Sequence, residues 1–135
     1  MKQATGVMVG CLLLFLLHAC AFDVVRMKQI PTKFESTSSS INAFELEKEV
    51  TVNLDTGYSR SLKKGSRWAC VGATPEGSVY RTKDQILTIE GSNIHEAFIV
   101  VKLKRLVGFY LPVERTFSPL SNSISLSFKE IQYNP

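Results

Sequence analysis

The sequence predicts a small all-β domain that follows an N-terminal export signal. Apolar and polar residues alternate with a period of two along much of residues 43–135, which is the pattern of half-buried strands. Turn signals containing Gly, Pro, Asn or Asp separate these runs. Such spacing is typical of a small antiparallel sandwich or barrel, and we expect about 6–8 short strands. The 135 residues leave room for one domain after the signal.

The first half of the domain is expected to begin with one strand over residues 46–54. Leu46, Val50, Val52 and Leu54 fall on one face of it together with Lys48. Turns at 55–57, 63–66 and 74–77 carry Gly at the positions that turns favour, and they separate further strands at 67–71, 78–81 and 85–90.

The second half contains one ambiguous segment, residues 94–103. Its start resembles a helix-capping box, but the β-branched run at 99–101 favours a strand, which we predict. A strand at 106–111 should stop at Pro112, with Gly108 marking a bulge or bend. We expect a loop at 118–123 and a last strand that places Ile124, Leu126 and Phe128 inward.

The first residues have the order of a secretion signal. A basic residue, Lys2, precedes an apolar block at 4–17, and small residues follow. The block is expected to form a signal helix. Leu17-His18-Ala19-Cys20 resembles the lipobox of bacterial lipoprotein precursors, and this resemblance implies a lipid on Cys20. Ala21 after the cysteine implies, by the same resemblance, the outer membrane facing the periplasm.

Two alternatives to lipidation stay open. Ala19-Cys20-Ala21 also suits the ordinary signal peptidase, which would release a soluble secreted protein. An uncleaved anchor is the third reading, because residues 4–22 are almost long enough to span a bilayer.

We therefore expect a signal peptide at 1–19, a serine-rich tether or linker at 20–42 and a β-domain at 43–135. Cys11 leaves with the signal and Cys20 is lipidated or removed, so Cys70 is unpaired and no disulfide framework forms. The chain also has no N-glycosylation sequon. Both features favour a bacterial envelope protein.

Two groups of residues are candidates for binding a partner. The first is a dense basic stretch, which could meet an anionic partner or serve only as a solvated loop, and which Lys102, Lys104 and Arg105 could extend. It consists of Arg60, Lys63, Lys64 and Arg67. The second is a set of apolar side chains around Pro112, which either covers an end of the sheet or contacts a partner. It consists of Phe109, Tyr110, Phe117 and Leu120.

Two single residues are weaker candidates. His95-Glu96 begins like the zinc motif H-E-x-x-H, but Ile99 holds the place of the second histidine, so we predict no metal site. His95 could still act as a base with Asp84 or Glu96, although a surface histidine is the simpler reading. Cys70 could be a reactive thiol or the site of an intermolecular disulfide, but we favour a small buried residue on the same face as Trp68.

These patterns predict a non-catalytic envelope lipoprotein whose periplasmic β-domain binds a protein partner, such as a component of an envelope or secretion assembly. The alternatives are a β-barrel that holds a small apolar or anionic ligand, and a small hydrolase that uses His95. No cofactor is expected. The net charge of +4 is too mild and too scattered to predict nucleic-acid binding.

Overall fold

The computed structural model describes residues 26–37 and 42–132, and these residues form an all-β fold, as predicted. Thirteen strands are present in the described part of the chain. They are β1 (Ile30–Pro31), β2 (Glu35–Ser36), β3 (Asn42–Leu46), β4 (Val50–Asn53), β5 (Ser59–Leu62), β6 (Arg67–Thr74), β7 (Gly77–Thr82), β8 (Thr88–Glu90), β9 (Ile94–Glu96), β10 (Phe98–Lys102), β11 (Arg105–Leu111), β12 (Thr116–Ser125) and β13 (Phe128–Gln132). The expected signal helix and Cys20 lie outside the described residues. Within those residues, no helix has the length and apolar character needed to cross a membrane.

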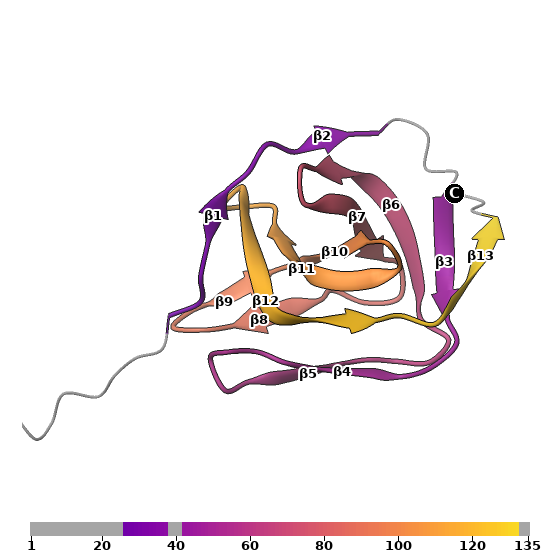
Figure 1. Ribbon diagram of the computed structural model, residues 1–135, viewed down its shortest axis with the longest axis horizontal. Helices are drawn as coiled ribbons and strands as arrows, with labels where there is room; N and C mark the ends of the chain where they lie inside the picture. Colours follow the sequence, from indigo (N-terminus) through magenta and orange to yellow (C-terminus); the bar gives the residue numbers. More distant parts are fainter. Residues whose placement is uncertain (1–25, 38–41, 133–135) are drawn as a thin grey trace, which may run out of the picture.

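Nine strands form one large antiparallel sheet (Figure 1), with the order β1-β12-β11-β10-β7-β6-β3-β13 and β2 paired to β6. Two separate hairpins, β4–β5 and β8–β9, supply buried residues to the same core cluster as the sheet, among them Val52, Leu62 and Ile89. The main core therefore lies between one face of the sheet and these two hairpins. This arrangement agrees with the predicted sandwich-like or barrel-like class.

The expected number of strands was wrong, because the structure has more than eight. One reason is that the strand predicted at 46–54 is divided into β3 and β4 by a bend at Glu47 and Lys48. Leu46 and Val50 are buried on either side of it, while the three charged residues 47–49 are exposed. The bend lets the chain leave the large sheet and enter the β4–β5 hairpin while both apolar groups stay in the core.

The loop predicted at 118–123 was also wrong, because these residues belong to the long strand β12. Ser118 pairs with Phe109 of β11 and is buried at 4% exposure, so a polar residue with turn-like composition lies in the sheet. The expected bulge is confirmed in the pairing of β11 with β10, where Val107 is an extra residue between the pairs Leu106–Val101 and Gly108–Val100. In the pairing with β12, four residues of β12, 120–123, lie opposite Val107. A Cβ at Gly108 would lie 2.6 Å from Phe117 Cε2, which explains why this position is Gly.

Residues 94–103 form strand and not helix, as predicted, but the single strand that was expected is wrong. The segment contains two strands, β9 and β10, which lie in different sheets, and Leu103 lies in the turn after β10. Strand β10 lies between β7 and β11 in the large sheet. Ile99, Val100 and Val101 are all buried, because both faces of this central strand are covered. The continuous β-branched run therefore reflects burial on both sides and not a helical stripe.

Part of the expected tether lies against the large sheet. Strand β1 pairs with β12, and β2 pairs with β6. Phe34 stacks on Tyr110 with ring centroids 4.8 Å apart, and so it helps to cover a second apolar cluster on the other face of the sheet. Gly72 permits this approach, because a Cβ there would lie 2.5 Å from Phe34 Cζ.

Candidate functional site

The predicted basic stretch does not form one patch of unpaired charge. Arg60 Nε donates to Thr88 O at 2.7 Å, and its guanidinium pairs with Glu90. Lys63 lies 3.9 Å from Glu49, and Lys64 is exposed. Acidic residues that are distant in the sequence therefore neutralise much of the stretch.

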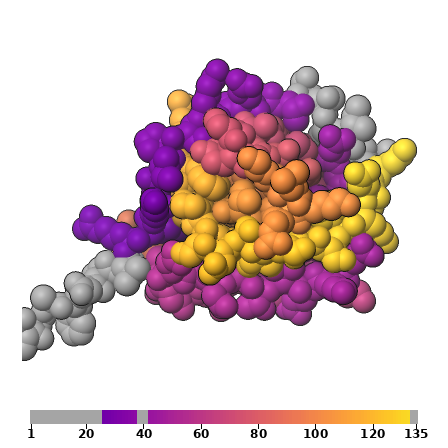
Figure 2. Space-filling view, viewed as in Figure 1, coloured from indigo at the N-terminus to yellow at the C-terminus, as the bar shows by residue number. Residues whose placement is uncertain are grey.

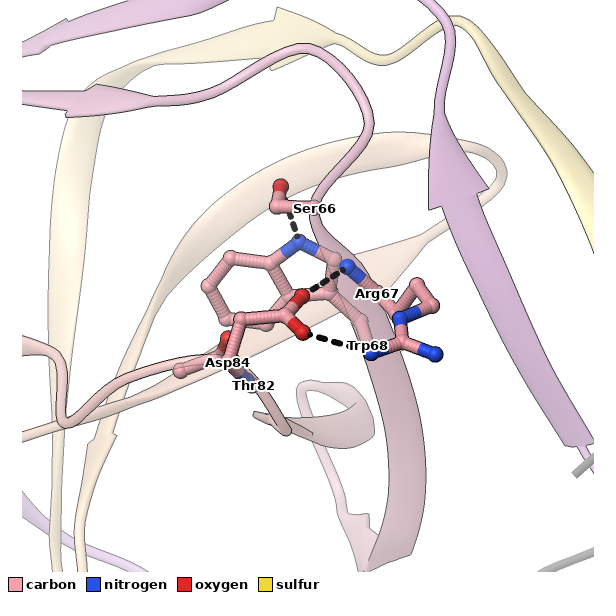
Figure 3. A network of polar contacts seen from close by, with 5 residues as sticks. All are labelled: Ser66, Arg67, Trp68, Thr82 and Asp84. Carbon is pink, nitrogen blue, oxygen red and sulfur yellow. Dashed lines mark hydrogen bonds and ion pairs between the residues drawn. The ribbon is translucent and has the colours of Figure 1, made fainter. Parts of the chain in front are cut away.

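Arg67, the fourth residue of the stretch, is held by Asp84 (Figure 3). The Arg67 backbone N–H donates to Asp84 Oδ2 at 2.8 Å, and its Nη2 donates to Oδ1 at 2.9 Å. These backbone and side-chain hydrogen bonds lower the pKa of Asp84, and the pKa of Arg67 is raised in turn. In the same network, the Trp68 indole N–H donates to Ser66 Oγ at 2.9 Å. Arg67 thus links the start of β6 to the segment that follows β7.

The suggested extension of the basic stretch lies at the same end of the sheet. Gly65 N–H donates to Leu46 O, Glu47 N–H donates to Ser127 O, and Leu126 N–H donates to Lys104 O. These bonds connect the β5–β6 turn to the β10–β11 turn. Arg105 is bound to Ser123 Oγ and O, and Lys104 Nζ lies 6.0 Å from the centre of the Phe128 ring. Lys102 is exposed.

The candidate apolar residues are mostly buried. Phe109 belongs to the main core at 1% exposure, whereas Tyr110 and Phe117 belong to the second cluster at 4% and 7%. Leu120 is partly buried against the main core. The structure therefore assigns these side chains to packing on both faces of the sheet.

His95 and Cys70 have local partners. His95 Nδ1 lies 2.6 Å from Glu114 Oε1, so its carboxylate partner is neither Asp84 nor Glu96. The half-buried thiol of Cys70 donates to Gly72 O at 3.5 Å. Among the described residues, no group of three or more His, Cys, Asp and Glu side chains is placed to hold a metal ion.

A hollow of about 360 Å³, which the sequence patterns did not predict, lies beside β13, and we call it the open-end hollow. It is lined by Asn42, Ala43, Phe44, Tyr80, Phe128, Glu130, Ile131 and Gln132. The Phe44 ring stacks on Phe128 at 4.4 Å and meets Tyr80 edge-on at 4.8 Å. Burial raises the pKa of Tyr80, and the nearby Cys70 and Glu130 raise it further.

Glu130 has an unusual place in this hollow. It pairs directly with Phe44, so its exposed carboxylate is on the same face of the sheet as the core aromatic residues. The period of two that places Ile124, Leu126 and Phe128 inward continues to Glu130. A charged residue at an inward position was the signal that could have revealed this site.

Comparison with protein families, with curated proteins and with solved structures finds no match to this chain.

Proposed function

We propose that this protein is a lipid-anchored envelope protein whose β-domain binds a protein partner in the periplasm and catalyses no reaction. The signal-like residues 1–19 and the lipobox-like residues ending at Cys20 support export and anchoring. The outer membrane is the proposed location, because Ala21 follows the cysteine.

The observation that carries partner binding is the free edge of β13 beside the open-end hollow. Strand β13 pairs with β3 on one side, and no described strand pairs with its other side. The backbone of such an edge can accept an extended segment of another protein, while a neighbouring hollow receives one of its side chains. Phe128 and Glu130 line this hollow, so the geometry suits a segment with a long basic side chain.

A second copy of this chain is a poorer occupant of the same edge. In a dimer with a two-fold axis, the β13 strands of the two copies would pair edge to edge and continue the sheet. All five residues of β13 pair only in the register that places Glu130 directly opposite Glu130 of the second copy. Like charges directly opposite each other destabilise a strand pair. Lys129 does not offset this repulsion, because it lies on the other face of the sheet. There it forms an ion pair with Glu45 at 2.9 Å, which raises the pKa of Lys129.

A photo-reactive residue in place of Gln132 tests this proposal in intact cells. We expect a covalent adduct with one defined protein when the probe is on β13, and none when it replaces the exposed Lys64. Substituting Glu130→Lys in the Gln132 probe strain should remove the adduct without unfolding the protein. Equal adducts from both positions, or none from β13, would overturn the proposal.

A second candidate function is the binding of a small apolar ligand in the open-end hollow. Its volume of about 360 Å³ and its three aromatic side chains favour this alternative. Native mass spectrometry of protein purified without denaturant distinguishes the two. A bound small molecule in the wild type that is absent from Tyr80→Ala would support ligand binding in the hollow. A wild-type mass equal to that of the protein alone would exclude tight binding of such a ligand.

A further inference from the structure

The chain between the proposed lipid and the folded domain is short. Cys20 and Arg26 are six residues apart, and an extended chain spans at most about 3.3–3.6 Å per residue. Met27 already packs against the main core, and Ile30 pairs with Phe117. A lipid on Cys20 would therefore hold the region around Arg26 within about 20 Å of the membrane surface.

Two turns that are distant in the sequence lie beside this starting point. A Cβ at Gly91 would be 3.2 Å from Met27 Cβ and 3.5 Å from Thr56 Cγ2. Thr56 Oγ1 also donates to Glu90 O at 2.8 Å. Figure 1 shows the β4–β5 turn, the β8–β9 turn and the first described residues together at the left of the molecule. We call this region, residues 26–29, 54–58 and 91–95, the tether end.

The exposed side chains of the tether end have the chemistry of a membrane interface. Tyr58 and Ile94 are 49% and 71% exposed. Arg26 and Lys28 are exposed, and neither forms an ion pair with a described residue. Tyrosine and basic side chains favour the headgroup layer, and an exposed aliphatic residue gains by entering it.

Three acidic groups at or near this end have polar contacts within the fold. Glu90 pairs with Arg60, Glu114 contacts His95, and Asp55 accepts a hydrogen bond from Ser121 Oγ at 2.6 Å. The ion pair with Arg60 cancels the charge of Glu90, whereas Asp55 keeps its charge because its partner is a neutral hydroxyl. Within residues 26–29, 54–58 and 91–95, Arg26 and Lys28 stand against Asp55 alone, so the tether end has a small positive charge. Such a surface attracts anionic lipids.

A hollow of about 390 Å³ lies within the tether end. It is lined by Arg26, Met27, Gln29, Ser92, Asn93 and His95. Because Thr116 Oγ1 donates to Gln29 Oε1 at 3.2 Å, the amide group of Gln29 remains a donor. The guanidinium, amide and hydroxyl donors of this hollow match the oxygen atoms of a phosphate group, which only accept hydrogen bonds.

We propose that the tether end rests on an anionic phospholipid surface, with a headgroup phosphate in the hollow beside Arg26 and with Tyr58 and Ile94 in the headgroup layer. The proposal rests on the lipid anchor that is part of the proposed function. It goes further, because it fixes which face of the domain meets the membrane.

Hydrogen exchange on the lipidated full chain tests this orientation. The protein is reconstituted in vesicles of phosphatidylcholine alone and in vesicles with about one third phosphatidylglycerol. We expect slower amide exchange at 54–58 and 91–95 in the anionic vesicles, and unchanged exchange at the opposite turns, 47–49 and 63–66. Arg26→Glu/Lys28→Glu should reduce this protection by more than about tenfold, since each cation near an anionic surface contributes about fivefold to binding.

The matched control is Lys48→Glu/Lys64→Glu, which changes the net charge equally at exposed positions in the opposite turns. It should leave the protection intact. An anchored protein that shows no protection at the tether end, or equal loss in both variants, would overturn the orientation but not the anchor. Equal protection by inorganic phosphate without anionic lipid would overturn the assignment to a headgroup. Failure of Cys20 to carry lipid would overturn the anchor and the orientation together.

Discussion

At the scale of single residues, charged side chains that are close in the sequence find separate acidic partners in the fold. Arg60 forms an ion pair with Glu90 of β8, whereas Arg67 forms an ion pair with Asp84, which follows β7. Each pair joins segments that are 17 or more residues apart. The basic stretch therefore connects elements as well as carrying charge, and only its exposed turn residues remain available to an anionic partner.

The Arg67–Asp84 contact predicts a specific loss of stability in acid. The hydrogen bonds from Arg67 keep the pKa of Asp84 below its unfolded value of about 3.9. The carboxylate therefore stabilises the fold above about pH 4, and this contribution is lost as the pH falls through the folded-state pKa. Asp84→Asn should lower the free energy of unfolding at neutral pH and reduce its further decrease below about pH 4.

Urea denaturation at a series of pH values measures this effect. Glu47→Gln, which removes one carboxylate from an exposed bend, is the control and should behave like the wild type. A pH dependence in Asp84→Asn that matches the wild type would contradict the role given to this contact.

Trp68 provides the second prediction at this scale. Its side chain is 1% exposed in the main core, and its indole N–H is satisfied by Ser66. Trp68→Ala should cost about 3–5 kcal/mol of unfolding free energy, because it leaves a large cavity and an unused hydroxyl partner. Tyr58→Ala, at a 49% exposed position, should change it by less than about 0.5 kcal/mol. Equal effects in chemical denaturation would show that Trp68 is not a core residue.

At the scale of elements, residues 30–36 cover the second face of the sheet, and we call this segment the N-terminal clamp. Strand β1 adds to β12, β2 adds to β6, and Phe34 between them stacks on Tyr110. This segment closes an apolar cluster that would otherwise face solvent. Residues 30–36 therefore lie in the fold, although they were expected to be part of the tether.

Phe34→Ala should loosen this clamp without disturbing the main core. The side chain is partly buried, so we expect a loss of about 1–3 kcal/mol of unfolding free energy. Hydrogen exchange should rise at 30–36 and at 116–118, while the amides of β4 and β5 keep their wild-type rates.

Gly72→Ala should change hydrogen exchange at the same residues as Phe34→Ala, because the new Cβ would clash with the Phe34 ring. Lys33→Ala, at an exposed position between β1 and β2, is the matched control. Uniform acceleration across the whole domain in Phe34→Ala would contradict an independent clamp.

The all-β class and the strands that cross the core could be predicted from local pattern. The apolar residues at 97–101 and 106–111 are buried or partly buried, as the pattern predicts, whereas Ile94 and Leu103 at the two ends of the first segment are exposed. Strand β12 was missed because Ser118 and Pro119 have turn-like composition, and only pairing with the bulged strand β11 keeps them in the sheet. The open-end hollow was missed because it joins β3, β7 and β13, and a single sequence does not reveal which strands become neighbours.

At the scale of the whole molecule, the two proposed surfaces lie at different ends. The described chain begins at the left of Figure 1, and strand β13 lies at the right. In the space-filling view, the indigo residues near the start are likewise at the left and the yellow residues of β13 at the right (Figure 2). A protein held at its tether end would therefore present the free edge of β13 away from the anchoring membrane.

The proposed anchor and the proposed orientation both depend on a lipid at Cys20, and metabolic labelling with palmitate tests for this lipid most directly. The wild-type chain and Cys20→Ser are expressed in parallel in a bacterial host, and the label is measured on the purified protein. We expect label on the wild type and none on Cys20→Ser. Absence of label from both proteins would contradict the anchor and would favour a soluble protein released after Ala21.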